Sequence, residues 1–191
     1  MTELVLPTRF CPPPAYYRMM ALHQGNVSVC LEERFDKRRK SAHRTAIADA
    51  RGVLELTVPI EKPYGKTWAE TKVSLHGRWW EVMSTALESA YGRTPYFEFY
   101  ADDFLPIISN PETFTTVSEL NSRFDVAIRR AIGLTRPVAA ADAGTRPAVI
   151  EPWEPQPYWQ VRREQLGFIG GLSILDMIFN LGPETLIHLQ R

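Results

Sequence analysis

The stretch Glu3–Leu31, ELVLPTRFCPPPAYYRMMALHQGNVSVCL, decides the class of fold. Residues 3–6 predict a short strand that Pro7 ends, and residues 27–31 predict a second strand. Between them, residues 15–23 carry apolar or aromatic side chains at helical spacing, and Gly25 follows as a stop signal. The order strand, loop, helix, strand favours an α/β fold.

The rest of the chain adds one clear strand and two long helices. Residues 53–60 predict a strand, because Val53, Glu55 and Thr57 alternate with Leu54, Leu56 and Val58. This alternation indicates that one face of the strand is more buried than the other. Apolar stripes at helical spacing predict helices over residues 78–91 and 116–132. We therefore expect a small central sheet of residues 3–6, 27–31 and 53–60, with helices packed on it and the C-terminal helices closing over the sheet.

Length and composition fit a single domain over residues 1–191, with a proline-rich loop at 136–157 inside it. Lys+Arg and Asp+Glu are both 22, and this zero net charge excludes a protein that holds nucleic acid by bulk charge. No apolar run approaches the roughly 18 residues of a membrane span, and no signal-peptide pattern opens the sequence. The two cysteines form no disulfide framework and have no metal-site spacing with the four histidines. We expect a cytoplasmic protein with no metal and no cofactor.

A basic segment, residues 34–44, interrupts this neutrality. It holds six Lys or Arg residues, opposed only by Asp36. It is either a solvated loop or a local site for an anionic group such as a diphosphate, held by Lys37, Lys40 and Arg44. His43 is a candidate base beside a bound anion, although a lone histidine is more often structural.

The proline loop before the first helix is a second candidate. Loops that follow strands of open α/β sheets often bind ligands, and Arg9 could hold an anion there. The glycines of a phosphate-binding loop are absent, so the loop is not a nucleotide fingerprint. The alternative to a ligand-binding loop is a stiff connection between strand and helix. Cys11 in this loop could act as a nucleophile only if the pKa of its thiol were depressed.

Polar residues also gather near the C-terminus. Ser173 fits a helix N-cap, with Asp176 as the acid of a capping box. Asp176 and Asn180 share one helix face, which makes Asp176 either a functional carboxylate or only a cap. A triad of Ser173, His43 and Asp176 is rejected because no G-x-S-x-G turn supports it. Glu88 and Tyr91 lie at the C-terminal end of the predicted helix 78–91, where an aromatic block over residues 91–104 begins. This block is either core or a platform for a sugar ring.

Two blocks of sequence carry a family resemblance. The stretch Ser89–Tyr100, SAYGRTPYFEFY, resembles the signature of the WbqC-like protein family. Tyr158-x-Gln160-Val161, Gly167-Phe168-Ile169 and Leu172–Glu184, LSILDMIFNLGPE, resemble its C-terminal block. The proline loop before Tyr16-Tyr17 and the Leu56–Ile60 strand stand in the expected order. One departure is Met83-Ser84-Thr85, where family members often carry His-Trp-Arg.

The resemblance implies a transferase of bacterial surface-polysaccharide (O-antigen type) biosynthesis, with aminoacyl (glycine) transfer to a sugar as the suggested reaction. Its substrate would be a small molecule or a nucleotide-linked sugar, and Asp176 or His43 would move the proton. Matching the family pattern adds the following candidate pocket residues: Tyr17, Trp79, Glu88, Tyr91, Tyr158, Gln160, Ser173 and Asn180.

Two other classes of function remain open at this stage. One is a binding module that recognises a nucleotide sugar or a glycan without turning it over. The other is an interaction protein whose aromatic block 91–104 forms an interface. An exposed apolar patch over that block would favour the interaction protein.

Overall fold

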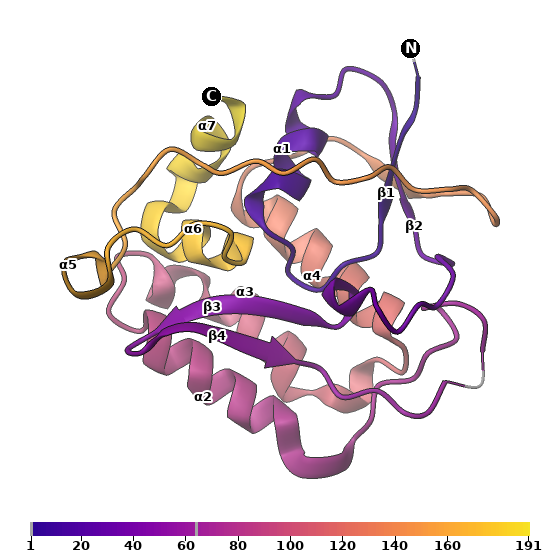
Figure 1. Ribbon diagram of the computed structural model, residues 1–191, viewed down its shortest axis with the longest axis horizontal. Helices are drawn as coiled ribbons and strands as arrows, with labels where there is room; N and C mark the ends of the chain where they lie inside the picture. The colour runs from indigo at the N-terminus through magenta and orange to yellow at the C-terminus, as the bar shows by residue number, and fades with distance from the viewer. Residues whose placement is uncertain (1, 64) are drawn as a thin grey trace.

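A computed structural model describes residues 2–63 and 65–191. It is a mixed α/β structure with two small sheets and helices around them (Figure 1). Three parallel strands, β1 (Leu4–Pro7), β2 (Val27–Cys30) and β5 (Val138–Ala140), pair in the order β1-β2-β5. The predicted α/β class is therefore confirmed.

The N-terminal unit forms as the sequence predicts. Helix α1 (Pro14–Leu22) connects β1 to β2, and Pro14 occupies the first helical turn, where its missing N–H costs no hydrogen bond. The Arg136 guanidinium donates to the carbonyl oxygens of Met20, at 2.7 Å, and His23, at 2.6 Å, and also to that of Gly25. This satisfies carbonyls that the end of α1 leaves unpaired.

The predicted position of strand 53–60 in the central sheet is wrong. Strand β4 (Gly52–Thr57) instead pairs antiparallel with β3 (Arg44–Asp49) in a separate two-stranded sheet. Strand β3 was not predicted, because its first residue, Arg44, belongs to the basic segment. The pairing of Asp49 with Gly52 leaves a two-residue turn, and Gly52 takes a φ of 119°, which favours glycine.

Three long helices contribute to the core: α2 (Trp79–Tyr91), α3 (Phe97–Ser109) and α4 (Val117–Ala131). The predicted start of α4 is confirmed, and Thr116 and Glu119 form a capping box there. The aromatic block is mostly core, because Phe97, Tyr100 and Phe104 are buried and Phe99 is exposed. Shorter helical segments are η1 (Lys40–Ala42), η2 (His76–Arg78), η3 (Pro111–Thr113) and α5 (Arg163–Leu166).

The C-terminal segments α6 (Ile174–Leu181), η4 (Gly182–Glu184) and α7 (Thr185–Gln190) close over the N-terminal part of the chain (Figure 1). The Ile174 N–H donates to the carbonyl of Pro12 at 2.9 Å, and the Ser173 hydroxyl donates to that of Cys11 at 2.9 Å. Arg18 of α1 donates to the carbonyl of Leu189 at 2.6 Å. Within the described part of the chain, no helix has both the length and the apolar character needed to cross a membrane.

Candidate functional site

Two hollows lie where the parallel strands end. The inner cavity, about 130 Å³ in volume, lies between the β1-β2-β5 sheet and α4 and is lined by Thr8, Arg9, Tyr17, Asn121 and Asp125, among others. The basic hollow, about 750 Å³, is formed by residues 32–39 after β2 and 144–147 after β5. Ligands of open α/β sheets bind outside the carboxyl ends of the strands, and both hollows occupy that position.

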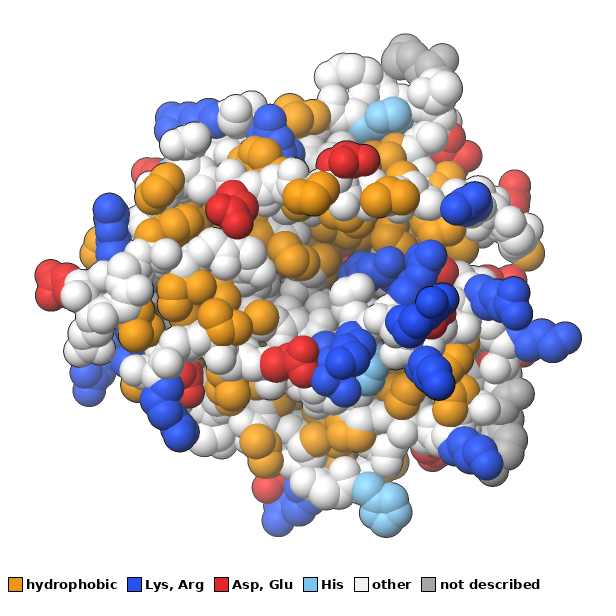
Figure 2. Space-filling model, in the orientation of Figure 1, with side chains coloured by type: hydrophobic (Ala, Val, Ile, Leu, Met, Phe, Trp, Pro, Cys, Tyr) orange, Lys and Arg blue, Asp and Glu red, His pale blue; other side chains and the backbone are white. Residues whose placement is uncertain are grey.

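The basic hollow carries cations without ion-pair partners. Asp36 binds Arg38 at 3.2 Å, and Glu33 binds Arg39. Arg34, Lys37 and Arg146 also line the hollow, and none of them pairs with an acid among residues 2–63 and 65–191. Figure 2 shows Lys and Arg side chains gathered over the connection from β2 to β3. The hollow therefore suits an anion.

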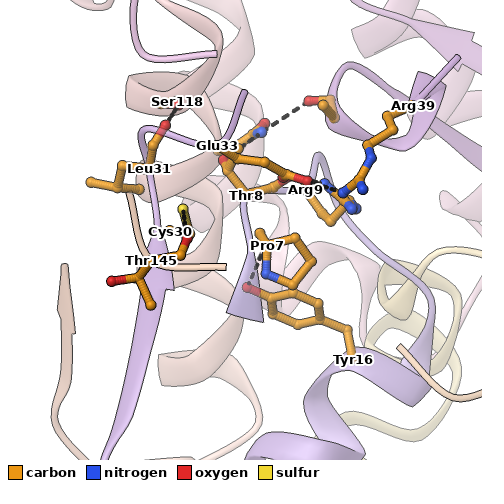
Figure 3. Close-up of polar contacts among 12 residues, drawn as sticks. Pro7, Thr8, Arg9, Tyr16, Cys30, Leu31, Glu33, Arg39, Ser118 and Thr145 are labelled. Atoms are coloured by element: carbon orange, nitrogen blue, oxygen red, sulfur yellow. Dashed lines mark hydrogen bonds and ion pairs between the residues drawn. The ribbon is translucent and has the colours of Figure 1, made fainter. Parts of the chain in front are cut away.

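A buried carboxylate links a residue of one hollow to a residue of the other (Figure 3). Glu33, only 5% exposed, accepts from Arg9 Nη1 at 2.8 Å through one oxygen and from Arg39 through the other. Arg9 lines the inner cavity and Arg39 lines the basic hollow. Glu33 was not predicted as a site residue, and its only signal in the sequence is its place between a predicted strand and the basic segment.

The inner cavity is lined by both polar and apolar side chains. The Tyr17 hydroxyl donates to Asp125 Oδ1 at 3.2 Å, and Arg129 Nε donates to Asp125 Oδ2 at 2.8 Å. Burial raises the pKa of Asp125 above its ordinary value, although the bonds from Arg129 and Tyr17 lower it. Arg9 and Tyr17 were predicted as site residues and do lie together here, whereas Asn121 and Asp125 were missed.

The predicted residues Lys40, His43 and Arg44 line neither hollow. Lys40 is exposed on η1, and Arg44 binds Glu55 at 2.6 Å across the β3-β4 hairpin. His43 is half-buried, with its Nδ1 atom 2.9 Å from the carbonyl oxygen of Val58. Its ring stacks on Trp68, with 5.8 Å between ring centroids.

Burial lowers the pKa of His43 below its ordinary value, and the positive charge of Arg44 lowers it further, against the bond to Val58. We expect the His43 pKa to lie below about 6.5 in a ¹H–¹³C NMR titration, assigned with a His43→Gln variant. Because its folded pKa is depressed, His43 contributes stability above the unfolded pKa that is lost as pH falls through the folded pKa. A titration midpoint above 6.5 would contradict this environment.

The C-terminal residues form one buried cluster. Asp176 accepts from the Tyr158 hydroxyl at 2.5 Å and from Gln160 Nε2 at 2.8 Å. Asn180 accepts from the Val161 N–H at 3.2 Å and donates to the Asp176 carbonyl at 2.7 Å. The prediction of a capping box was wrong for Asp176, because its carboxylate bonds these distant side chains instead. The N-cap itself is confirmed, since the Ser173 hydroxyl accepts from the Leu175 N–H at 3.2 Å.

This cluster leaves almost no free volume. A cavity of about 10 Å³ lies between Tyr91, Gln160 and Asp176, which is room for about one water molecule. The Tyr91 hydroxyl is buried there without a hydrogen-bond partner among the described residues. Burial raises the pKa of Asp176, against the bonds from Tyr158 and Gln160. The cluster joins the segment after residue 157 to α6.

Two further predicted residues lie apart from both hollows. Trp79 is buried, and its Nε1 donates to the Ser74 carbonyl at 2.8 Å, which makes it part of the packing at the start of α2. Glu88 is exposed on α2, in a surface hollow of about 520 Å³ with Arg93 and Arg162. The predicted pocket is thus divided between the strand ends, the hairpin and the C-terminal cluster.

The residues at the strand ends lie in a part of the chain that matches a known protein family. The profile of the WbqC-like protein family matches residues 8–148. The chain belongs to this family. In this WbqC-like chain, the matched residues include both walls of the inner cavity and the basic segment, and they end before Tyr158. No curated protein and no solved structure matches the chain. Within the described residues, no group of three His, Cys, Asp or Glu is arranged to bind a metal ion.

Proposed function

We propose that this protein is a transferase of bacterial surface-polysaccharide (O-antigen type) biosynthesis that acts on a nucleotide-linked sugar. One observation carries the proposal: Arg34, Lys37 and Arg146 converge on a hollow beside the carboxyl ends of β2 and β5 without acidic partners among the described residues. Guanidinium and ammonium groups form short charge-assisted hydrogen bonds to phosphate oxygens. The family resemblance of the sequence implies the same kind of substrate.

The transferred group is proposed to be an aminoacyl group such as glycine, supplied by an activated donor. A sugar hydroxyl or amine attacks the acyl carbon, the leaving group departs with its electron pair, and a base takes the proton of the nucleophile. His43 has the electronic character of such a base, since Nδ1–H donation to Val58 leaves Nε2 with a free lone pair. Its lowered pKa keeps the ring neutral near pH 7.

Binding of an inorganic probe tests the hollow directly. We expect pyrophosphate to bind the wild-type protein in isothermal titration calorimetry, and to bind at least about tenfold more weakly when Arg34, Lys37 and Arg146 are replaced by serine. The physical reason is the loss of three cations beside the ligand. The matched control replaces three exposed cations elsewhere, Arg51, Lys72 and Arg191, by serine, with the same change in net charge. Equal weakening in both triple variants would overturn the proposed site.

A non-catalytic binding module is the second candidate function. It is favoured by the separation of the two candidate proton-transfer residues, His43 and Asp176, from the lining of both hollows. The two candidates are distinguished by a His43→Gln variant in cells that depend on the protein. A transferase that uses His43 loses its polysaccharide product, whereas a binding module keeps its cellular function.

A further inference from the structure

We propose that the inner cavity is a subsite for the acylamino group of a sugar, so that the ligand class is a phosphate-linked N-acylated amino sugar. The proposal deepens the proposed function and rests on it. The residues that line the cavity supply three features: an unpartnered hydrogen-bond acceptor on Asn121, free donor groups on Arg9 and an apolar wall. An acylamino group presents the complement of each, namely an N–H, a carbonyl oxygen and a methyl group.

The acceptor is the side chain of Asn121, which is 3% exposed. Asn121 Nδ2 donates to the Ala42 carbonyl at 2.9 Å and to Thr8 Oγ1 at 3.1 Å. The Ala42 carbonyl can only accept, which fixes the orientation of the amide. Asn121 Oδ1 is therefore the atom left without a partner among residues 2–63 and 65–191, and buried acceptors of this kind are rare in folded proteins.

The donor comes from Arg9. Its Nη1 donates to Glu33 Oε2 at 2.8 Å and to the Thr8 carbonyl at 2.7 Å. The remaining Arg9 N–H groups donate to no described residue, and its side chain lies in the lining of the cavity. A guanidinium in this position can donate to the carbonyl oxygen of a ligand.

The apolar wall is one face of the β2-β5 pair. Val29 pairs with Ala140 and Val27 with Val138, so these side chains lie on the same face of the sheet. Val29, Val138 and Ala140 line the cavity. A cavity of about 150 Å³ holds benzene, so about 130 Å³ accommodates an acetamido group with its methyl against this wall.

The two hollows are placed for one ligand. Glu33 lines the basic hollow and bonds both Arg9 of the inner cavity and Arg39 of the basic hollow, so a single carboxylate links the two linings. A sugar phosphate can therefore put its phosphate on the basic side and its ring substituent in the cavity. A hydroxyl group at the same position of the sugar would donate to Asn121 Oδ1 but leave the apolar wall uncovered. An ammonium group there would need the carboxylate of Asp125 as its partner.

Three sugar phosphates that differ only at the 2-position test the proposal. We expect N-acetylglucosamine 1-phosphate to bind at least about tenfold more tightly than glucose 1-phosphate or glucosamine 1-phosphate in calorimetric titrations. The Ala140→Leu variant fills the cavity and should abolish this preference. The control, Ala50→Leu, adds the same side chain on the exposed turn between β3 and β4, outside the lining of both hollows, and should keep the preference. Circular dichroism confirms that both variants fold.

Each other outcome is informative. Equal affinity for the three compounds, or tighter binding of glucosamine 1-phosphate, overturns the acylamino subsite. Failure of all three to bind overturns it as well, while pyrophosphate titration decides separately whether the basic hollow holds phosphate. A preference that survives in Ala140→Leu places the acyl group elsewhere. A further measurement needs no variant. We expect a nuclear Overhauser effect between the acetyl methyl of the bound ligand and the methyls of Val29 and Val138. Its absence from a bound complex would contradict the proposal.

Discussion

Replacing Glu33 by glutamine is expected to lower the free energy of unfolding by about 3 kcal/mol. The Glu33 side chain is 4% exposed and holds Arg9, whose side chain is 12% exposed, together with the more exposed Arg39. A neutral amide cannot accept from both guanidinium groups through two oxygens, so Arg9 would keep a poorly compensated charge in a buried place. Removing one partner of a buried ion pair is costly for this reason.

The matched control for this prediction is Glu32→Gln, which makes the same change in charge at an exposed neighbour. Urea unfolding should show a loss below about 0.5 kcal/mol for this variant. A loss for Glu33→Gln as small as that of the control would contradict a structural role for the ion pairs of Glu33 with Arg9 and Arg39. The Glu33→Gln substitution also removes a negative charge from the basic hollow. Pyrophosphate should therefore bind more tightly to this variant than to the wild type.

Replacing Asp176 by alanine is the second large effect, with an expected loss of about 2–4 kcal/mol. The buried Tyr158 hydroxyl would lose its acceptor, Gln160 Nε2 would keep only its bond to the Ile169 carbonyl, and a cavity would open. An Asp102→Ala variant on the exposed side of α3 should cost less than about 0.5 kcal/mol. Equal midpoints in urea for the two variants would show that the cluster does not stabilise the fold.

An Asp176→Asn variant adds a test of charge. Because burial raises the folded pKa of Asp176, its contribution to stability is fully present below the unfolded pKa and is lost as pH rises through the folded value. The side-chain amide of the variant does not titrate. The stability of the wild type relative to this variant, measured by urea unfolding, should therefore be greater at pH 4 than at pH 8. A difference that does not change with pH would contradict a raised pKa.

Local signals predicted much of the fold. The strand-helix-strand order, the start of α4 near residue 116 and the Ser173 cap of α6 all depend on residues close in sequence. The pairing of β4 was not predictable in this way, because its partner β3 follows a basic run and offers few strongly apolar residues. Helix α3 was missed because aromatic residues are weak helix formers and Pro106 lies inside it.

The candidate site was predicted only in part. Arg9 and Lys37 were chosen for their positions after a strand and in the basic segment, and Tyr17 for the family resemblance, and all three line one of the two hollows. Asn121 and Asp125 belong to a helix whose prediction rested on its apolar stripe, so nothing nearby distinguished them. The bond between Tyr158 and Asp176 joins residues 18 positions apart and depends on tertiary packing.

The contacts between the two ends of the chain bear on how the protein is made. The carbonyl of Cys11 is held by the hydroxyl of a residue 162 positions later, and Arg18 binds a carbonyl 171 positions later. Ribosomes add about 5–20 residues per second, so the loop after β1 waits about 10–30 s for these partners. During synthesis this loop is exposed while much of the remaining core can already assemble. The loop that carries Arg9 is translated well before the C-terminal segments and completes its contacts only after they have emerged.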